Sequence, residues 1–80
     1  MQYNSKTIEE YFKYHPPKTP ERIAKHDAIN NAALAFAKIV IENVIDFATR
    51  DAAISAIQQA RMFSNQGITV DELRGEGVAV

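Results

Sequence analysis

The chain has 80 residues and a formal net charge of −1, and 46% of its residues are hydrophobic and 24% charged. This composition is typical of a folded globular protein, and it excludes both a disordered chain and the broad positive surface that bulk binding to DNA requires. The lack of cysteine excludes disulfide bonds, and the length suits one domain, residues 1–80, with a small core.

The first predicted element is a short helix over about residues 7–13. Thr7 and Glu10 have the spacing of a capping box, in which each side chain accepts a hydrogen bond from a backbone N–H of the first turn. The helix cannot continue through Pro16 and Pro17, because proline has no N–H to donate and forces the preceding residue out of the helical region. Residues 14–19 are therefore predicted to form an extended, proline-rich corner.

A long helix is predicted over about residues 20–47. Thr19 has the position of an N-cap, Pro20 fits the first helical position, and Glu21 lies near the positive end of the helix dipole. No helix-breaking residue follows up to Phe47. Apolar residues recur along two rows of this helix, one through Ile29, Ala33, Val40 and Val44, the other through Ile23, Leu34, Ile41 and Ile45.

The second long element is predicted to be a helix over about residues 50–66. Thr49 is expected to be its N-cap, and Gly67 is expected to end it. Residues 67–80 are assigned to a C-terminal tail, in which residues 69–74 allow one further helical turn. Because the connection between the long helices is short, they should be antiparallel neighbours. The predicted fold is all-α, an antiparallel helical hairpin with a short N-terminal helix.

The two apolar rows of the long helix form an arc that is wider than one partner helix can cover. We therefore expect the chain to assemble into a homo-oligomer. The sequence has no run of 18 apolar residues, and residues 2–5 are polar where a signal peptide would be hydrophobic, so we expect a cytoplasmic protein without a membrane partner. The two histidines have no further ligands at a suitable spacing, which does not support a metal site.

No arrangement of residues in the sequence indicates catalysis. There is no recognisable nucleophile with a nearby histidine and no pair of carboxylates placed for acid–base chemistry, while Glu9 and Glu10 fit the acidic first turn of a helix. The three glycines, at positions 67, 75 and 77, form no phosphate-binding loop. We therefore expect no enzymatic activity and no cofactor.

The most informative segment for binding is Tyr14-His15-Pro16-Pro17-Lys18. Its aromatic ring can stack on a nucleobase, and its hydroxyl, imidazole and ammonium groups can bind phosphate oxygens. The alternative is that the prolines only form a corner, which Tyr14 and His15 pack against the hairpin.

A second polar set lies on one face of the first turns of the long helix, at spacings of three or four residues: Arg22, Lys25, His26 and Asn30. Such a face beside a helix N-terminus favours anions, although an ordinary solvated surface has the same pattern. Near the end of the second helix, Met62 and Phe63 are expected in the core, and Asn65 is expected to cap or bond the terminal backbone.

Three blocks of the sequence resemble a known family. They are Phe12-Lys13-Tyr14-His15-Pro16-Pro17 with Thr19-Pro20-Glu21-Arg22, then His26-Asp27-Ala28-Ile29, then Arg50-Asp51-Ala52-Ala53-Ile54 leading to Ala60-Arg61-Met62-Phe63-Ser64-Asn65. In this order they are similar to the phage proteins called anti-CBASS cyclic-oligonucleotide sponges, which carry a helical-hairpin domain. The resemblance covers roughly residues 8–68.

The resemblance implies a protein that sequesters cyclic dinucleotide or trinucleotide messengers of bacterial immunity without cleaving them, in the cytoplasm of the infected bacterial host. It also implies a homo-oligomer, commonly a hexamer, with ligands at the subunit interfaces. By position, Tyr14 matches a tyrosine near the ligand phosphates, and the adjoining His15, Pro16 and Pro17 match the neighbouring corner. Our predicted ligand-binding residues are Tyr14, His15, Pro17, Lys18, Arg22, Lys25 and Asn30.

Two positions depart from the family pattern. Asn30 stands where the family commonly has a basic residue, and Val70 stands where it has a terminal arginine, so the preferred nucleotide stays open. The alternative function belongs to a different class. It is a non-enzymatic protein–protein interaction module without a nucleotide ligand, in which the apolar stripe of the hairpin docks another protein.

Overall fold

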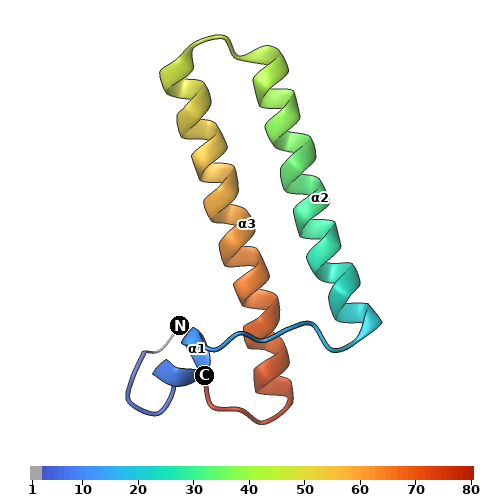
Figure 1. Ribbon diagram of the computed structural model, residues 1–80, viewed down its shortest axis with the longest axis vertical. Helices are drawn as coiled ribbons and strands as arrows, with labels where there is room; N and C mark the ends of the chain where they lie inside the picture. Colours follow the sequence, from blue (N-terminus) through green and yellow to red (C-terminus); the bar gives the residue numbers. More distant parts are fainter. Residues whose placement is uncertain (1–2) are drawn as a thin grey trace.

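The computed structural model describes residues 3–80, and it contains three helices and no strand over that range. Helix α1 spans Ile8–Phe12, α2 spans Pro20–Asn43 and α3 spans Phe47–Gly75. Helices α2 and α3 run antiparallel, and α1 lies at the end of the hairpin opposite their connection (Figure 1). The prediction of an all-helical hairpin with a short N-terminal helix is confirmed.

The start of α2 was predicted correctly, but its end was not. The Thr19 side chain accepts a hydrogen bond from the backbone N–H of Arg22 at 3.2 Å, as an N-cap does, and Pro20 is the first helical residue. The helix ends at Asn43 and not at Phe47, because Val44 adopts an extended conformation. The Asn43 side-chain amide donates to the backbone oxygen of Ile39 at 2.8 Å, in the last turn of the helix.

The N-cap of α3 is Asp46, and the prediction of Thr49 for this position was wrong. The Asp46 carboxylate accepts a hydrogen bond from the backbone N–H of Thr49 at 3.0 Å and another from its hydroxyl at 2.7 Å. These bonds lower the pKa of Asp46 from its usual value, the backbone bond having the larger effect. The helix therefore begins at Phe47, three residues earlier than expected.

Helix α3 also continues beyond the predicted stop at Gly67, and residues 68–75 belong to the helix and not to a tail. The side chains of Val70 and Leu73 are buried, and their packing outweighs the cost of about 1 kcal/mol of one glycine in a helix interior. The helix ends at Gly75, and two residues later the φ of 83° at Gly77 lets the backbone N–H of Val78 reach the carbonyl oxygen of Leu73 at 2.8 Å.

The capping box predicted at the start of α1 does not form. The Thr7 side chain makes no cap hydrogen bond with the helix, and its oxygen accepts instead from the backbone N–H of Asn4 at 3.2 Å. The Asn4 side chain accepts from the backbone N–H groups of Lys6 and Thr7, so an Asn-centred turn leads into the helix.

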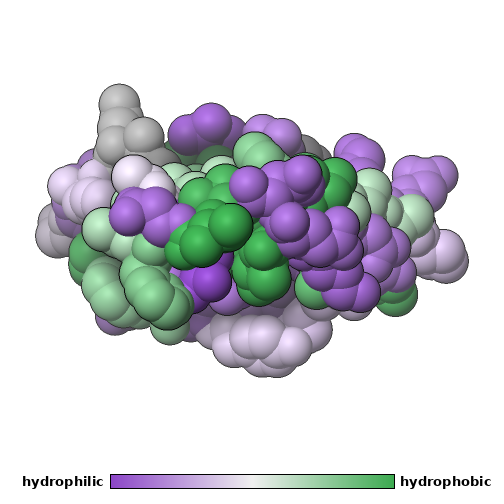
Figure 2. Space-filling view, turned by 90° about the horizontal axis from the view of Figure 1, so that it is seen from above, coloured by the Kyte–Doolittle hydropathy of each residue, from purple (hydrophilic) through white to green (hydrophobic). Residues whose placement is uncertain are grey.

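The core of one chain is thin. Among residues 3–80, the buried hydrophobic side chains are those of Val40, Val70 and Leu73. Much of the apolar surface of α2, of the connection and of the start of α3 is exposed, including Leu34, Phe36, Ile39, Ile41, Ile45 and Phe47. Figure 2 looks down on the connection end of the hairpin and shows hydrophobic residues gathered in the middle of that face. Within the described range, no helix has the length and hydrophobicity needed to cross a bilayer.

Candidate functional site

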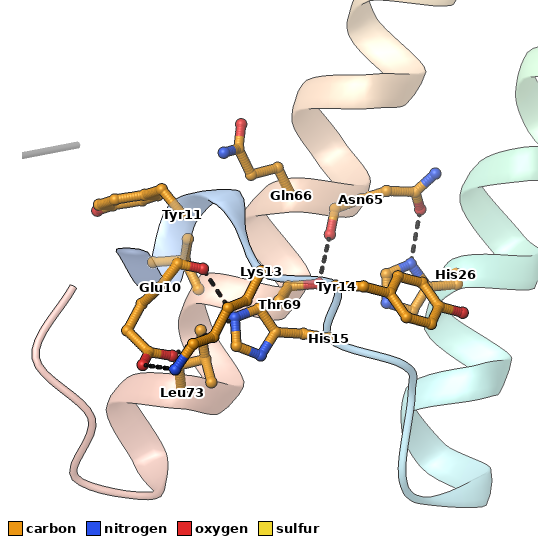
Figure 3. Close-up of a pocket in the computed structure, with 11 residues that line it drawn as sticks. Glu10, Tyr11, Lys13, Tyr14, His15, His26, Asn65, Gln66, Thr69 and Leu73 are labelled. Carbon is orange, nitrogen blue, oxygen red and sulfur yellow. Dashed lines mark hydrogen bonds and ion pairs between the residues drawn. The ribbon is translucent and has the colours of Figure 1, made fainter. Parts of the chain in front are cut away.

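The candidate site lies at the end of the hairpin where the segment after α1 passes α3. A cavity of about 260 Å³ opens there, and its walls come from α1, from the segment that follows it, from α2 and from α3 (Figure 3). Its polar lining includes Glu10, Tyr14, His15, His26, Asn65 and Thr69, and its floor includes Leu73. Three regions that are distant in the sequence, residues 10–15, α2 and α3, therefore meet at one concave surface.

His15 is fixed at this cavity by the end of α1. Its Nε2 atom lies 2.7 Å from the backbone oxygen of Glu10, and because a carbonyl can only accept, this nitrogen donates. The Glu10 carboxylate lies 3.5 Å from the same nitrogen and 3.0 Å from the Lys13 ammonium. That carboxylate raises the pKa of Lys13, through a hydrogen bond first and through charge second. Among residues 3–80, the second ring nitrogen of His15 makes no hydrogen bond. It is therefore available to a ligand.

A chain of side-chain hydrogen bonds joins α2 to α3 beside the cavity. The His26 Nδ1 atom lies 2.8 Å from the Asn65 amide oxygen (Figure 3). The Asn65 amide nitrogen donates to the Asn30 side-chain oxygen at 2.9 Å. Because α3 continues past Asn65, this residue does not cap a helix end, and the prediction that it would do so was wrong. Asn65 instead orients one residue of the cavity wall, His26, and one of the predicted ligand residues, Asn30.

Tyr14 is the most exposed side chain of the cavity lining, at 86%. It also lines a second, larger hollow of about 1030 Å³ on the surface of α3, beside Met62 and Phe63. These two residues are 61% and 64% exposed, so the prediction that they pack in the core was wrong. Tyr14 thus stands between two concave surfaces, with a ring that is open to stack on a planar group.

The other predicted ligand residues lie apart from this cavity. Lys18 and Arg22 form ion pairs with the carboxylates of Glu72 and Glu76. Lys25 lines a separate depression together with Ile68, Asp71 and Glu72. Asn30 lines a hollow farther along α2, and Pro17 is exposed.

Of the cavity residues, only Tyr14 and His15 were in the predicted ligand set, and His26 and Asn65 are among those that were missing from it. His26 shares a helical face with Arg22 and Asn30, so the sequence did place it near them. The partnership of His26 with Asn65 joins residues 39 positions apart, and only the packing of the two helices brings them together. Within residues 3–80, no group of three or more histidine, aspartate and glutamate side chains is placed to hold a metal ion.

These features define a class of protein, a small helical hairpin that presents an exposed aromatic ring beside an open polar cavity, as binding domains do. A family model described as the Acb2/Tad1 hairpin domain matches residues 4–69. The chain therefore belongs to the Acb2/Tad1 hairpin family, the anti-CBASS cyclic-oligonucleotide sponges, whose domains are of a non-catalytic type. Searches of curated proteins and of solved structures found no match. The family assignment made from the sequence is confirmed, and membership supports an anti-CBASS sponge role in general.

Proposed function

We propose that this protein sequesters cyclic dinucleotides, with cyclic trinucleotides as a second ligand class, and that it breaks no bond in them. By holding these messengers it would inhibit CBASS-type defence against phage. The observation that carries the proposal is the 86% exposed Tyr14 ring, which lines a cavity together with two histidines and an asparagine amide. An aromatic face and several hydrogen-bonding groups suit a ligand made of bases and phosphodiesters.

Each group has a separate part in the proposed binding. The Tyr14 ring stacks on a nucleobase, a contact worth about 1–3 kcal/mol in single-stranded nucleic acid complexes. The Tyr14 hydroxyl donates to a phosphodiester oxygen. The second ring nitrogens of His15 and His26 are acceptors when the nitrogen bonded to a carbonyl oxygen carries the ring proton, so they accept from N–H groups of a base. Asn65 keeps the His26 ring in place. No group in this set needs to transfer a proton, because capture leaves the ligand intact.

We further propose that copies of the chain complete the site. The cavity is open, and large apolar side chains of α2 and of the connection are exposed, which a second copy can cover. A homo-oligomer, with the six subunits that the resemblance implies, would place these cavities at boundaries between chains. Closure by a partner slows the release of ligand, and slow release is what stoichiometric capture requires.

Cyclic dinucleotides are proposed as the principal ligand because of the two departures from the family pattern. Val70, which stands where the family has an arginine, lines the cavity with a side chain that carries no charge. Asn30 stands in place of a basic residue, and its side-chain oxygen accepts from Asn65. A site with fewer cations gains less binding free energy from each additional phosphate of the ligand, because a hydrogen bond to a charged group contributes about 1.5–3 kcal/mol.

The test is recovery of the ligand after binding. Purified protein is incubated with a panel of cyclic di- and trinucleotides, separated from free ligand by size exclusion, denatured, and the released nucleotide is identified by mass spectrometry. Intact nucleotide released on denaturation supports capture. Cleaved nucleotide would indicate an enzyme, and no bound nucleotide across the panel would favour a protein–protein interaction module. Light scattering on the same column gives the number of subunits.

A further inference from the structure

The cavity beside Tyr14 is too small to enclose a whole cyclic dinucleotide. Its volume is about 260 Å³, whereas pockets that enclose a small-molecule ligand typically measure about 300–1,000 Å³. The larger hollow of about 1030 Å³ adjoins the cavity, because Tyr14, Asn65 and Gln66 line both surfaces. A ligand that stacks on Tyr14 therefore extends onto the part of α3 that forms the larger hollow.

The larger hollow has one charged side chain among the described residues that line it, and this side chain belongs to Arg61. The other lining residues have uncharged aromatic, thioether and amide side chains, including Met62 and Phe63. Arg61 lies one helical turn before Asn65, so the two share a face of α3. An anion that rests on this surface beside Tyr14 therefore has a cation within the same lining.

The positive charge of Arg61 is not neutralised by a carboxylate of the chain. Arg61 is only partly exposed, yet it forms no ion pair among residues 3–80. Its Nε donates to the side-chain oxygen of Gln58 at 2.7 Å, and over the same range its two terminal nitrogens make no hydrogen bond. A partly desolvated charge without a counter-charge costs free energy, which a bound anion offsets.

The cations of the proline-rich corner and of the start of α2 differ from Arg61 in this respect. They are already paired, Lys18 with Glu76 and Arg22 with Glu72 and Glu76. None of these residues lines the cavity or the larger hollow. Arg61 is thus better placed than the basic residues of our predicted ligand set, Lys18, Arg22 and Lys25, to meet a phosphate beside Tyr14.

We propose that Arg61 is a ligand-binding residue, whose terminal nitrogens bind a phosphodiester of a cyclic dinucleotide that spans the cavity and the larger hollow. This inference rests on the proposed function. The planar guanidinium can donate two parallel hydrogen bonds to two oxygens of one phosphate. One base stacks on Tyr14, and the exposed side chains of Met62 and Phe63 offer apolar surface to the rest of the ligand.

The experiment measures the affinity of the wild-type protein and of Arg61→Gln for cyclic di-AMP and cyclic di-GMP by isothermal titration calorimetry, at low and at high salt. Arg50→Gln is the matched control. Arg50 belongs to the same helix and its side chain is also partly exposed, at 26%, but it is paired with Asp51, lies over the Phe47 ring and lines neither surface. Thermal unfolding and light scattering verify the fold and the assembly of each variant.

The expected result is that Arg61→Gln weakens binding about 10- to 150-fold, the order of one charge-assisted hydrogen bond to a phosphate. Its affinity should also fall less steeply with added salt than that of the wild-type protein, because one attraction between opposite charges is gone. Arg50→Gln should keep both the affinity and the salt dependence. Arg61→Lys keeps the charge without the planar fork, so it should bind more weakly than the wild-type protein with a similar salt dependence.

The salt dependence separates phosphate binding from a structural role. If the wild-type protein binds and Arg61→Gln has the same salt dependence, Arg61 only shapes the surface of α3 and the inference is overturned, whatever the affinity. An equal loss in Arg50→Gln also overturns it. If Arg61→Gln does not fold, Arg61→Lys decides, and a shallower salt dependence in that variant contradicts the proposal. If the wild-type protein binds no cyclic nucleotide, the proposed function fails, and this inference fails with it.

Discussion

Replacing Tyr14 with alanine should weaken nucleotide binding and leave the fold intact. Tyr14 is 86% exposed, and exposed substitutions usually change the free energy of unfolding by less than about 0.5 kcal/mol. For a domain of this size, that corresponds to a shift in melting temperature of less than about 4 °C. The loss of one stacked base costs about 1–3 kcal/mol, which raises the dissociation constant about 5- to 150-fold at 25 °C.

The assay is calorimetric titration with cyclic di-AMP, alongside thermal unfolding and light scattering to verify the oligomer. Phe12→Ala is the matched control, because Phe12 is an aromatic residue of the same region, is 82% exposed and does not line either cavity that Tyr14 lines. Tyr14→Phe keeps the ring and tests the hydroxyl alone. Wild-type affinity in Tyr14→Ala, or an equal loss in Phe12→Ala, would refute the assignment of Tyr14 to the site.

Three further predictions concern stability. Thr19→Ala removes the N-cap of α2 and should lower the free energy of unfolding by about 1 kcal/mol, measured by urea denaturation; an unchanged midpoint would contradict the cap. Leu73→Ala removes a buried side chain and should cost about 2–5 kcal/mol in the same measurement, whereas a loss below 1 kcal/mol would show that the core does not depend on it. The Thr49 N–H lowers the pKa of Asp46 below its usual 3.8, so this bond stabilises the fold above that pH and the stability is lost as the pH falls through the lowered pKa. Melting temperature against pH should fall less steeply in Asp46→Asn at the acidic end, and parallel curves would disprove the linkage.

The sequence predicted the helices better than it predicted their ends. Thr19 and Pro20 marked the start of α2 because both residues act locally, through one side-chain oxygen and one missing N–H. The choice between Asp46 and Thr49 as the next cap could not be made locally, since both residue types cap helices well. Gly67 was misleading for another reason. Its intrinsic cost is small, and long-range burial of Val70 and Leu73 keeps the helix going.

The site was predictable where its residues are neighbours in sequence. Tyr14 and His15 line the cavity as the proline-rich corner suggested. The ion pairs of Arg22 were not visible, because its partners Glu72 and Glu76 lie 50 or more positions away in a segment assigned to the tail. The same reason hid the partnership of His26 with Asn65. Spacing on one helix gives the face of a residue, but only the packing of two helices gives its partner.

The thin core has a consequence for dosage. Among residues 3–80, each chain buries three hydrophobic side chains, Val40, Val70 and Leu73. In the proposed homo-oligomer, much of the stability would come from contacts between copies, and the folded fraction would then depend on the concentration of the chain. The amount of messenger that the protein can capture would therefore rise more steeply than the amount of protein expressed. A promoter change that halves the amount of protein would remove more than half of the protection.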